Sequence, residues 1–264
     1  MGRRLRSSLF RASALHAAWR VLSAAARHGS PVSESPAMEI TWYGRSCVRL
    51  RGKDVVVVAD AYPSIVGPTG RGITGDIVTY SHPDDAPLPR GRGTHPRTAN
   101  DGATVVPGSL EQAFVLDGPG EYEVRHVLVT GVRTARDDTR GAERGRNVAF
   151  VCEIDGLHTI HLGDIGHTLS DEKLGEIGDV DIACVPVGGA LSAAKAAELI
   201  AQLDVKIAIP MPVCDDGVCA DAIARFFHEM GAGEVTAPQA KLSLSVSSLP
   251  DEVTTVLLDS RGRS

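Results

Sequence analysis

The amino-acid sequence predicts a mixed α/β domain that begins near residue 38, and three observations predict it. Short apolar runs bounded by turn residues dominate the first part of this region, as expected for β-strands. The last third alternates such runs with segments whose apolar residues recur every three or four positions, as in helices packed on a sheet. Hydrophobic residues make up 43% of the 264 residues, an ordinary share for a protein with a packed core.

The first part of the domain is predicted to be rich in β-structure. A tight turn at 44–46 separates the first two strands, the fourth ends in a polar loop over 81–89, and Gly156 supplies the turn of a hairpin between the last two. The predicted strands cover residues 39–43, 47–50, 54–59, 76–80, 124–132, 148–154 and 158–162.

The last third is predicted to alternate. Ser192 is expected to cap a helix that runs to Leu203, because a serine hydroxyl can accept a hydrogen bond from the first turn. A second helix is predicted over 218–230, where apolar residues lie four apart. The accompanying strands are expected at residues 180–187, 205–209, 234–237 and 254–258.

Residues 1–37 are predicted to lie outside the domain, which then comprises residues 38–264. They carry six arginines and one acid, Glu34, and their apolar residues are spaced for an amphipathic helix. This composition is typical of an organellar transit peptide. Met38 offers another interpretation, in which translation starts there and the extension is flexible or misassigned.

Charge and cysteine content exclude several function classes. The whole chain has a net charge of −6, and residues 38–264 alone carry −11, so we expect no nucleic-acid partner. No apolar run is long enough for a membrane span, so no membrane partner is expected either. Five scattered cysteines without a C-x-x-C pair indicate reduced thiols and a cytoplasmic protein, and Cys214 and Cys219 match structural zinc poorly.

Several segments, in matching order, resemble lactonase-like members of the metallo-β-lactamase superfamily. The opening ITWYGRSCVRL resembles their W-x-G-H-S-C turn, and DIVTYSHPDD lies where they have an H-x-H-x-D-H metal loop. The stretches HLGDIGH, DVDIACVPVGG and KIAIPM resemble downstream elements, and GPGEYEV resembles a motif of one branch of predicted hydrolases. The resemblance implies a four-layer αββα sandwich, with one or two zinc or related ions at one edge activating water for hydrolysis.

The loop after residue 80 departs from the family's pattern, because it contains one histidine where the family has three. A gapless alignment places His82 on the first family histidine. An alignment with a two-residue deletion keeps that match and places Asp84 on the family's aspartate and Asp85 on its last histidine. The sequence leaves both alignments open.

Three further positions lack the family's histidines. Arg136 stands at the next ligand position, Pro212 at the final one, and Arg45 at the early G-H-S-C position. Asp164 alone matches a family ligand cleanly, as the bridging aspartate. Arginine stays protonated and has no lone pair for a cation. A dinuclear zinc centre is therefore not expected, and Arg136 can instead pair with Asp164 or Asp84.

The residues that remain define the candidate site. No catalytic residue is assigned. Either one Zn²⁺ or another divalent ion binds weakly, or no ion binds, and the sequence leaves the two open. The candidate metal ligands are His82, Asp84, Asp85 and Asp164. The side chains expected to support them from behind are Asp60, Arg136, His161 and His167.

Two functions fit a site that keeps only some of the family's metal ligands. The first is a weak, mononuclear metal-dependent hydrolase of the ester, lactone or phosphodiester class. The second is a catalytically inactive relative that keeps the sandwich as a binding or interaction module. In either case the partner is an unidentified small molecule or protein, because function depends on the site rather than on the fold.

Overall fold

The structure is a computed structural model that describes residues 37–85, 97–100, 102, 104–214 and 219–261. The expectations for residues 1–36, including the amphipathic helix, lie outside the described residues. So does the loop beyond Asp85, as far as residue 96. Among the described residues, no helix is long and apolar enough to cross a membrane.

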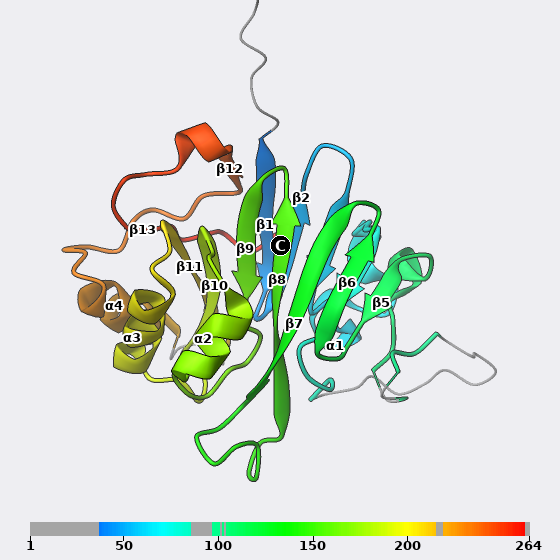
Figure 1. The fold of residues 1–264 in the computed structure, drawn as a ribbon, viewed down its shortest axis with the longest axis horizontal. Coiled ribbons are helices and arrows are strands. Elements are labelled where there is room, and N and C mark those ends of the chain that lie inside the picture. The colour runs from blue at the N-terminus through cyan, green and yellow to red at the C-terminus, as the bar shows by residue number, and fades with distance from the viewer. Residues whose placement is uncertain (1–36, 86–96, 101, 103, 215–218, 262–264) are drawn as a thin grey trace, which may run out of the picture. The chain divides into compact units, whose positions relative to one another are not determined.

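Two β-sheets form the centre of the domain (Figure 1). In the first sheet, β1, β2 and β3 form an antiparallel meander, and β3, β4 and β5 are parallel. In spatial order this six-stranded sheet comprises β12 (Leu242–Leu244), β1 (Met38–Gly44), β2 (Cys47–Arg51), β3 (Val56–Ala59), β4 (Ile77–Thr79) and β5 (Phe114–Leu116).

The second sheet has seven strands. The strands β6 to β9 are antiparallel neighbours, whereas β9, β10, β11 and β13 are parallel. In spatial order it comprises β13 (Thr254–Thr255), β11 (Ile207–Pro212), β10 (Ile182–Val187), β9 (Leu157–His161), β8 (Arg146–Ile154), β7 (Val127–Ala135) and β6 (Gly120–Val124).

The helices lie outside the sheets. In Figure 1 the three longer helices cover one face of the seven-stranded sheet, where α3 and α4 lie against β10, α4 also contacts β11, and α2 contacts β7. The α-helices are α1 (Pro63–Val66), α2 (Asp171–Ile177), α3 (Ala193–Leu203) and α4 (Cys219–Glu229). Single 3₁₀ turns occur at η1 (Gly70–Gly72), η2 (Gly108–Leu110) and η3 (Val246–Ser248).

Three apolar clusters follow from this layering. The first joins both sheets, and Ile40 of one sheet and Phe150 of the other are fully buried in it. The second lies between the seven-stranded sheet and helices α2 to α4, and it includes Leu199 and Phe226. The third packs Tyr62 beside α1 against the six-stranded sheet. The predicted αββα order of layers is confirmed.

Local signals in the sequence account for most elements. Ser192 accepts a hydrogen bond from the Lys195 amide at 3.3 Å, so the predicted cap of α3 is confirmed. The predicted hairpin at Gly156, whose φ is +79°, joins β8 and β9. The strand predicted over 234–237 is wrong: these residues are exposed and pair with no strand, and the edge strand is β12 instead.

The cysteines divide into two groups. Cys47, Cys152 and Cys184 are buried free thiols, as expected, and burial raises the pKa of the Cys152 and Cys184 thiols to about 12. Cys214 and Cys219 form a disulfide, with a Cα–Cα distance of 5.4 Å, which corrects the expectation of reduced thiols for this pair. The end of β11 and the start of α4 bring the two cysteines together. Their spacing of five positions is not the C-x-x-C pattern, so the sequence did not indicate this disulfide.

Candidate functional site

The candidate residues meet at one edge of the two sheets because each follows a strand that ends there. Asp60 and His82 come after the parallel strands β3 and β4. Arg136 follows β7 and Asp164 follows β9, and both strands are antiparallel to β8 between them. Strands that share a direction present their carboxyl ends at the same edge, so distant segments of sequence converge there.

Arg136 lies at the centre of this edge and bridges two carboxylates. Its Nε and Nη2 donate to Oδ2 of Asp164 at 2.9 and 2.8 Å. Its Nη1 donates to Oδ1 of Asp85 at 2.7 Å, and Nη2 also donates to Oδ2 of that residue. The guanidinium thus forms the paired, charge-assisted contacts that match a carboxylate best. Of the two pairings expected for Arg136, Asp164 is present, and Asp85 takes the place of Asp84.

The ionic pairing is reflected in the pKa values. Burial acts to lower the pKa of Arg136, but hydrogen bonds with Asp85 and Asp164 outweigh it and raise that pKa further. Partial burial acts to raise the pKa of Asp85, but the hydrogen bonds and positive charge of Arg136, together with the nearby His82 and Arg144 side chains, outweigh burial and lower this pKa. Arg136 and Asp85 are therefore charged at neutral pH.

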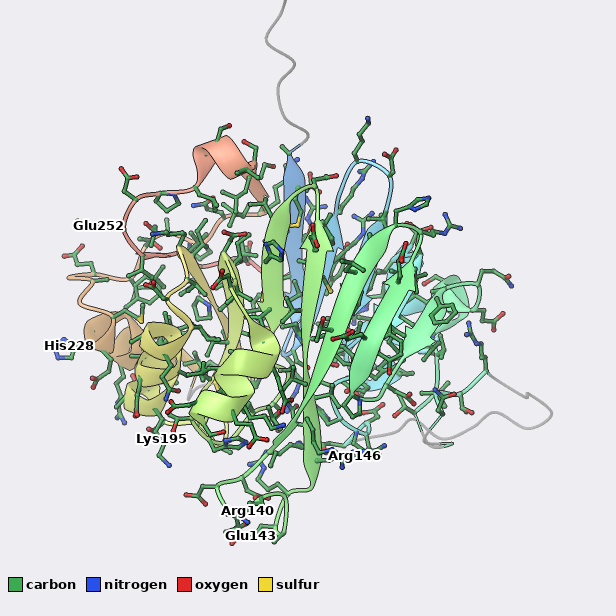
Figure 2. All side chains as sticks on the ribbon, in the orientation of Figure 1. Arg140, Glu143, Arg146, Lys195, His228 and Glu252 are labelled. Carbon is green, nitrogen blue, oxygen red and sulfur yellow. A yellow bond between two sulfur atoms is a disulfide. The ribbon has the colours of Figure 1, made fainter. Side chains whose placement is uncertain are left out.

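A second arginine reaches Asp164 from the loop between β7 and β8. Arg144 Nη2 donates to Asp164 Oδ2 at 3.1 Å. The loop is closed by Asp137, whose carboxylate accepts hydrogen bonds from the backbone amides of Arg144, Glu143 and Gly141, and these bonds hold its pKa well below the ordinary value. Figure 2 shows Arg140 and Glu143 projecting outward at the far end of this loop, whereas Arg144 turns back toward the site.

Asp60 is fully buried behind the site and organises the loop that carries His82. Its carboxylate accepts hydrogen bonds from the Ser81 amide at 2.8 Å, the Ser81 hydroxyl at 2.6 Å and the Tyr62 hydroxyl at 3.1 Å. The backbone of Asp60 is left-handed, with φ of +50°. Nε2 of His161 lies 3.9 Å from Oδ2 of Asp60 and 2.7 Å from the carbonyl oxygen of Ser46. Asp60 and His161 thus lie behind the loop that carries His82.

His82 is buried and faces the same cavity as the candidate carboxylates. Its ring stacks on Tyr62 with a centroid distance of 5.1 Å, and its Nδ1 lies 2.8 Å from the Pro83 carbonyl oxygen. With Asp84, Asp85 and Asp164 it lines a cavity of about 200 Å³. The structure therefore brings all four candidate ligands to one cavity. Asp84 contributes differently from its neighbour, because its Oδ1 accepts from the Ser64 hydroxyl at 2.7 Å.

His167 supports the backbone near Arg136. Its Nε2 accepts a hydrogen bond from the Ala135 amide at 3.1 Å, so Nδ1 carries the proton and donates to the Thr168 carbonyl at 2.7 Å. Both ring nitrogens are thereby used.

Asn147 was not among the residues that the sequence singled out, although it positions Asp164. Its Oδ1 accepts from the Asp164 amide at 3.0 Å, while Nδ2 donates to Thr134 Oγ1 and the Leu162 carbonyl. The side chain is fully buried. An asparagine in a β-strand is unusual enough to have served as a signal.

The donor atoms at this edge do not fit a metal ion as they are arranged. Both oxygens of Asp85 and Oδ2 of Asp164 accept hydrogen bonds from arginine, and the guanidinium between them has no lone pair to offer. Catalytic zinc normally needs three protein ligands and an open position. Within the described part of the chain, no three His, Cys, Asp or Glu side chains form a group able to hold an ion.

The sequence and fold can be compared with known proteins. Residues 39–212 match the model of the family described as the beta-lactamase superfamily domain. The chain belongs to this family. A candidate zinc-dependent hydrolase of the metallo-β-lactamase superfamily from Thermotoga maritima superposes with a TM-score of 0.59 at 28% identity, covering 84% of this chain and 98% of that one. The superfamily resemblance seen in the sequence is confirmed.

Curated relatives of this beta-lactamase superfamily member include archaeal proteins of the UPF0173 group. A UPF0173 metal-dependent hydrolase from Methanoregula boonei is 31% identical over 192 residues, which is 66% of this chain and 81% of that protein. A UPF0173 protein from Pyrococcus abyssi is 26% identical over 181 residues, 66% of this chain and 82% of its own length. The chain is thus a beta-lactamase superfamily member related to proteins named as metal-dependent hydrolases.

Proposed function

We propose that this chain is a member of the superfamily whose reduced site does not hydrolyse substrates, and that it acts as a binding module. The observation that carries the proposal is the position of Arg136. Its guanidinium contacts Asp164 and Asp85 at the edge where relatives named as metal-dependent hydrolases would need a cation. The guanidinium of Arg136 therefore supplies the positive charge that a bound metal ion would otherwise supply.

Electrostatics supports this interpretation. Two buried or partly buried carboxylates without a counterion would be costly, and a metal ion or a guanidinium can each offset that cost. Arg136 offsets it permanently, since arginine stays protonated at any accessible pH. A guanidinium cannot lower the pKa of a bound water molecule in the way that a catalytic ion does, so the nucleophile for hydrolysis is missing.

Zinc binding and hydrolysis test the proposal together. The full chain, purified without a metal-chelating column and treated with a chelator, is mixed with zinc and weighed by mass spectrometry under native conditions. We expect well under one ion per chain. We also expect no hydrolysis of generic lactone, β-lactam or phosphodiester substrates above the rate without protein.

One specific observation supports the alternative of a weak mononuclear hydrolase: His82, Asp84, Asp85 and Asp164 line a single cavity. An ion bound there would have to displace Arg136 from both carboxylates. Stoichiometric binding of one zinc ion, with metal-dependent hydrolysis that Asp164→Asn abolishes, would replace the binding module by this alternative.

A further inference from the structure

A second cavity adjoins the candidate site and is larger than it. Its volume is about 530 Å³, within the range of small-molecule sites in proteins. The two cavities share Arg45, Ser64 and Ile65 in their walls. The second cavity is walled by the end of β1, by α4 and by the C-terminal segment around Leu257.

The walls of this cavity combine apolar surface with positive charge. The apolar side chains include Trp42, Ile65, Ile223 and Leu257, which come from four separate segments of the chain. Two arginines, Arg45 and Arg71, and one acid, Asp259, supply the charged side chains among the described lining residues. The described lining residues therefore carry one more positive charge than negative, in a chain of net charge −6.

The backbone at both arginines is held in an uncommon conformation. Arg45 has φ of +46° and Arg71 has φ of +47°, in the left-handed region that non-glycine residues rarely adopt. At Arg45 the surroundings fix this conformation, because Trp42 Nε1 donates to the Arg45 carbonyl at 2.7 Å. Strained residues that their surroundings hold in place occur preferentially at ligand sites. Here they place two guanidinium-bearing residues around one cavity.

We propose that this second cavity binds a small amphipathic anion, with a carboxylate or phosphate head on Arg45 and Arg71 and an apolar body against Trp42 and Leu257. Guanidinium groups match both head groups by paired hydrogen bonds. The apolar wall stabilises the rest of the molecule by removing it from water. The proposal rests on the proposed function in one respect, namely that the bound molecule is held and not cleaved.

Fluorescence of Trp42 provides the test, because the chain has only two tryptophans and Trp19→Phe leaves Trp42 as the single reporter. The probes are octanoate, octyl phosphate and octylammonium, which share a chain length and differ in the head. We expect saturable changes with the two anions and none with octylammonium. The anion that binds more tightly identifies the preferred head group as carboxylate or phosphate.

Variants locate the head group. Arg45→Gln and Arg71→Gln should each weaken binding of the preferred anion about tenfold, the effect expected for one lost charge-assisted hydrogen bond. Arg133→Gln, an exposed arginine on β7, should leave it unchanged. Equal binding of octylammonium, or no effect of either variant while the thermal melting curve is unchanged, would overturn the proposal.

The two proposals can fail separately. If the anions bind as expected but the protein also takes up one zinc ion and hydrolyses esters, the proposed function fails and the anion site stands. If neither anion changes the fluorescence or gives heat on titration calorimetry, the anion site fails, and the zinc measurement still decides the proposed function.

Discussion

Arg136 and Asp164, 28 residues apart in the sequence, are joined by two hydrogen bonds from one guanidinium to a single carboxylate oxygen, and both side chains are more than nine-tenths buried. Arg144 donates a hydrogen bond to the same oxygen, and Arg136 also donates to the carboxylate of Asp85. The edge of the sheets is thus held together by an ionic network within the chain. Its strength can be measured by removing one member at a time.

Replacing Arg136 by methionine keeps most of the volume and removes the charge. Asp164 would remain buried with Arg144 alone, and Asp85 would lose both of its bonds to Arg136. Breaking a buried ion pair from one side costs about 3 kcal/mol, so we expect a loss of this size in the free energy of unfolding, measured with urea at pH 7. Arg133→Met, on the same strand but exposed, is the control and should change little. A loss under about 1 kcal/mol would show that the network is not structural.

The pair between Arg136 and Asp85 should depend on pH. The pKa of Asp85 is lowered in the folded protein, because contacts with Arg136 outweigh the opposing effect of burial. A lowered carboxyl pKa adds stability that is complete above the ordinary value of about 4 and is lost as pH falls through the folded value. Asp85→Asn should therefore be less stable than the unmodified protein at pH 7, and the difference should shrink below about pH 4.

The Asp85 side chain is 54% exposed, so solvent screens the pair and the effect should be modest. Asp138→Asn, which removes a more exposed carboxylate near Lys195, serves as the control. A difference between Asp85→Asn and the unmodified protein that stays constant from pH 7 to pH 3 would count against an ionic contribution.

Gly163 is required for the backbone turn that delivers Asp164. Its φ is +63°, and a Cβ there would lie 2.4 Å from Ser81 Cβ and 2.5 Å from Asn147 Oδ1. Gly163→Ala should therefore combine backbone strain with overlap in a packed region and cost about 3 kcal/mol. Gly145→Ala is a matched control, since Gly145 also has a positive φ of +90° but no atom within 4 Å of the added carbon. It should cost only about 1 kcal/mol. Equal losses would show that strain, not packing, limits both sites.

The sequence predicted those parts of the fold that have strong local signals. Helix α3 has a capping serine and a clear apolar stripe, and β10 is a continuous apolar run, so both were found within two residues. Helix α2 was not predicted because it is short and contains Gly175, and β6 was not predicted because it begins within the run Gly118, Pro119 and Gly120, which is typical of turns.

The candidate site was predictable only in part. A family resemblance placed Arg136 and Asp164 at ligand positions, and their charges indicated that they could pair. The sequence named Asp84 and not Asp85 as the other possible partner of Arg136, because adjacent residues in a loop point in different directions and the sequence does not fix which one faces inward. Asn147 could have been noticed as a polar residue within a strand, but its bond to the Asp164 amide, like the bonds of Asp137 to backbone amides, joins groups that only the fold brings together.

The extent of the folded domain is a further prediction. Strand β1 begins at Met38, whose side chain is fully buried between the sheets. A chain that starts at Met38 should keep its core and melt within a few degrees of the full chain, as followed by circular dichroism. A start at Thr41 is the comparison, because it removes Met38 and Ile40 from the core and should lower the melting temperature strongly. If the chain starting at Met38 also melts much lower, residues 1–37 stabilise the domain.

The last prediction restores a metal ligand. Arg136→His removes the guanidinium and puts an imidazole at the position that the resemblance assigns to a histidine ligand. Asp85 and Asp164 would then lose their bonds to Arg136, and His82 lines the same cavity. Pro212→His adds a second imidazole at the end of β11, a further position where the resemblance expects a ligand. With three or more donors available, the double variant should bind zinc at least about tenfold more tightly than the unmodified chain.

Because an ion that binds only the folded state stabilises it, zinc should raise the melting temperature of the double variant and not that of the unmodified protein. Arg133→His adds a histidine outside the site and should show no such shift. If the double variant folds, keeps its circular dichroism spectrum and still gains no stability from zinc, then Arg136 does not stand at a ligand position, and its bonds to Asp164 and Asp85 reflect structural pairing alone.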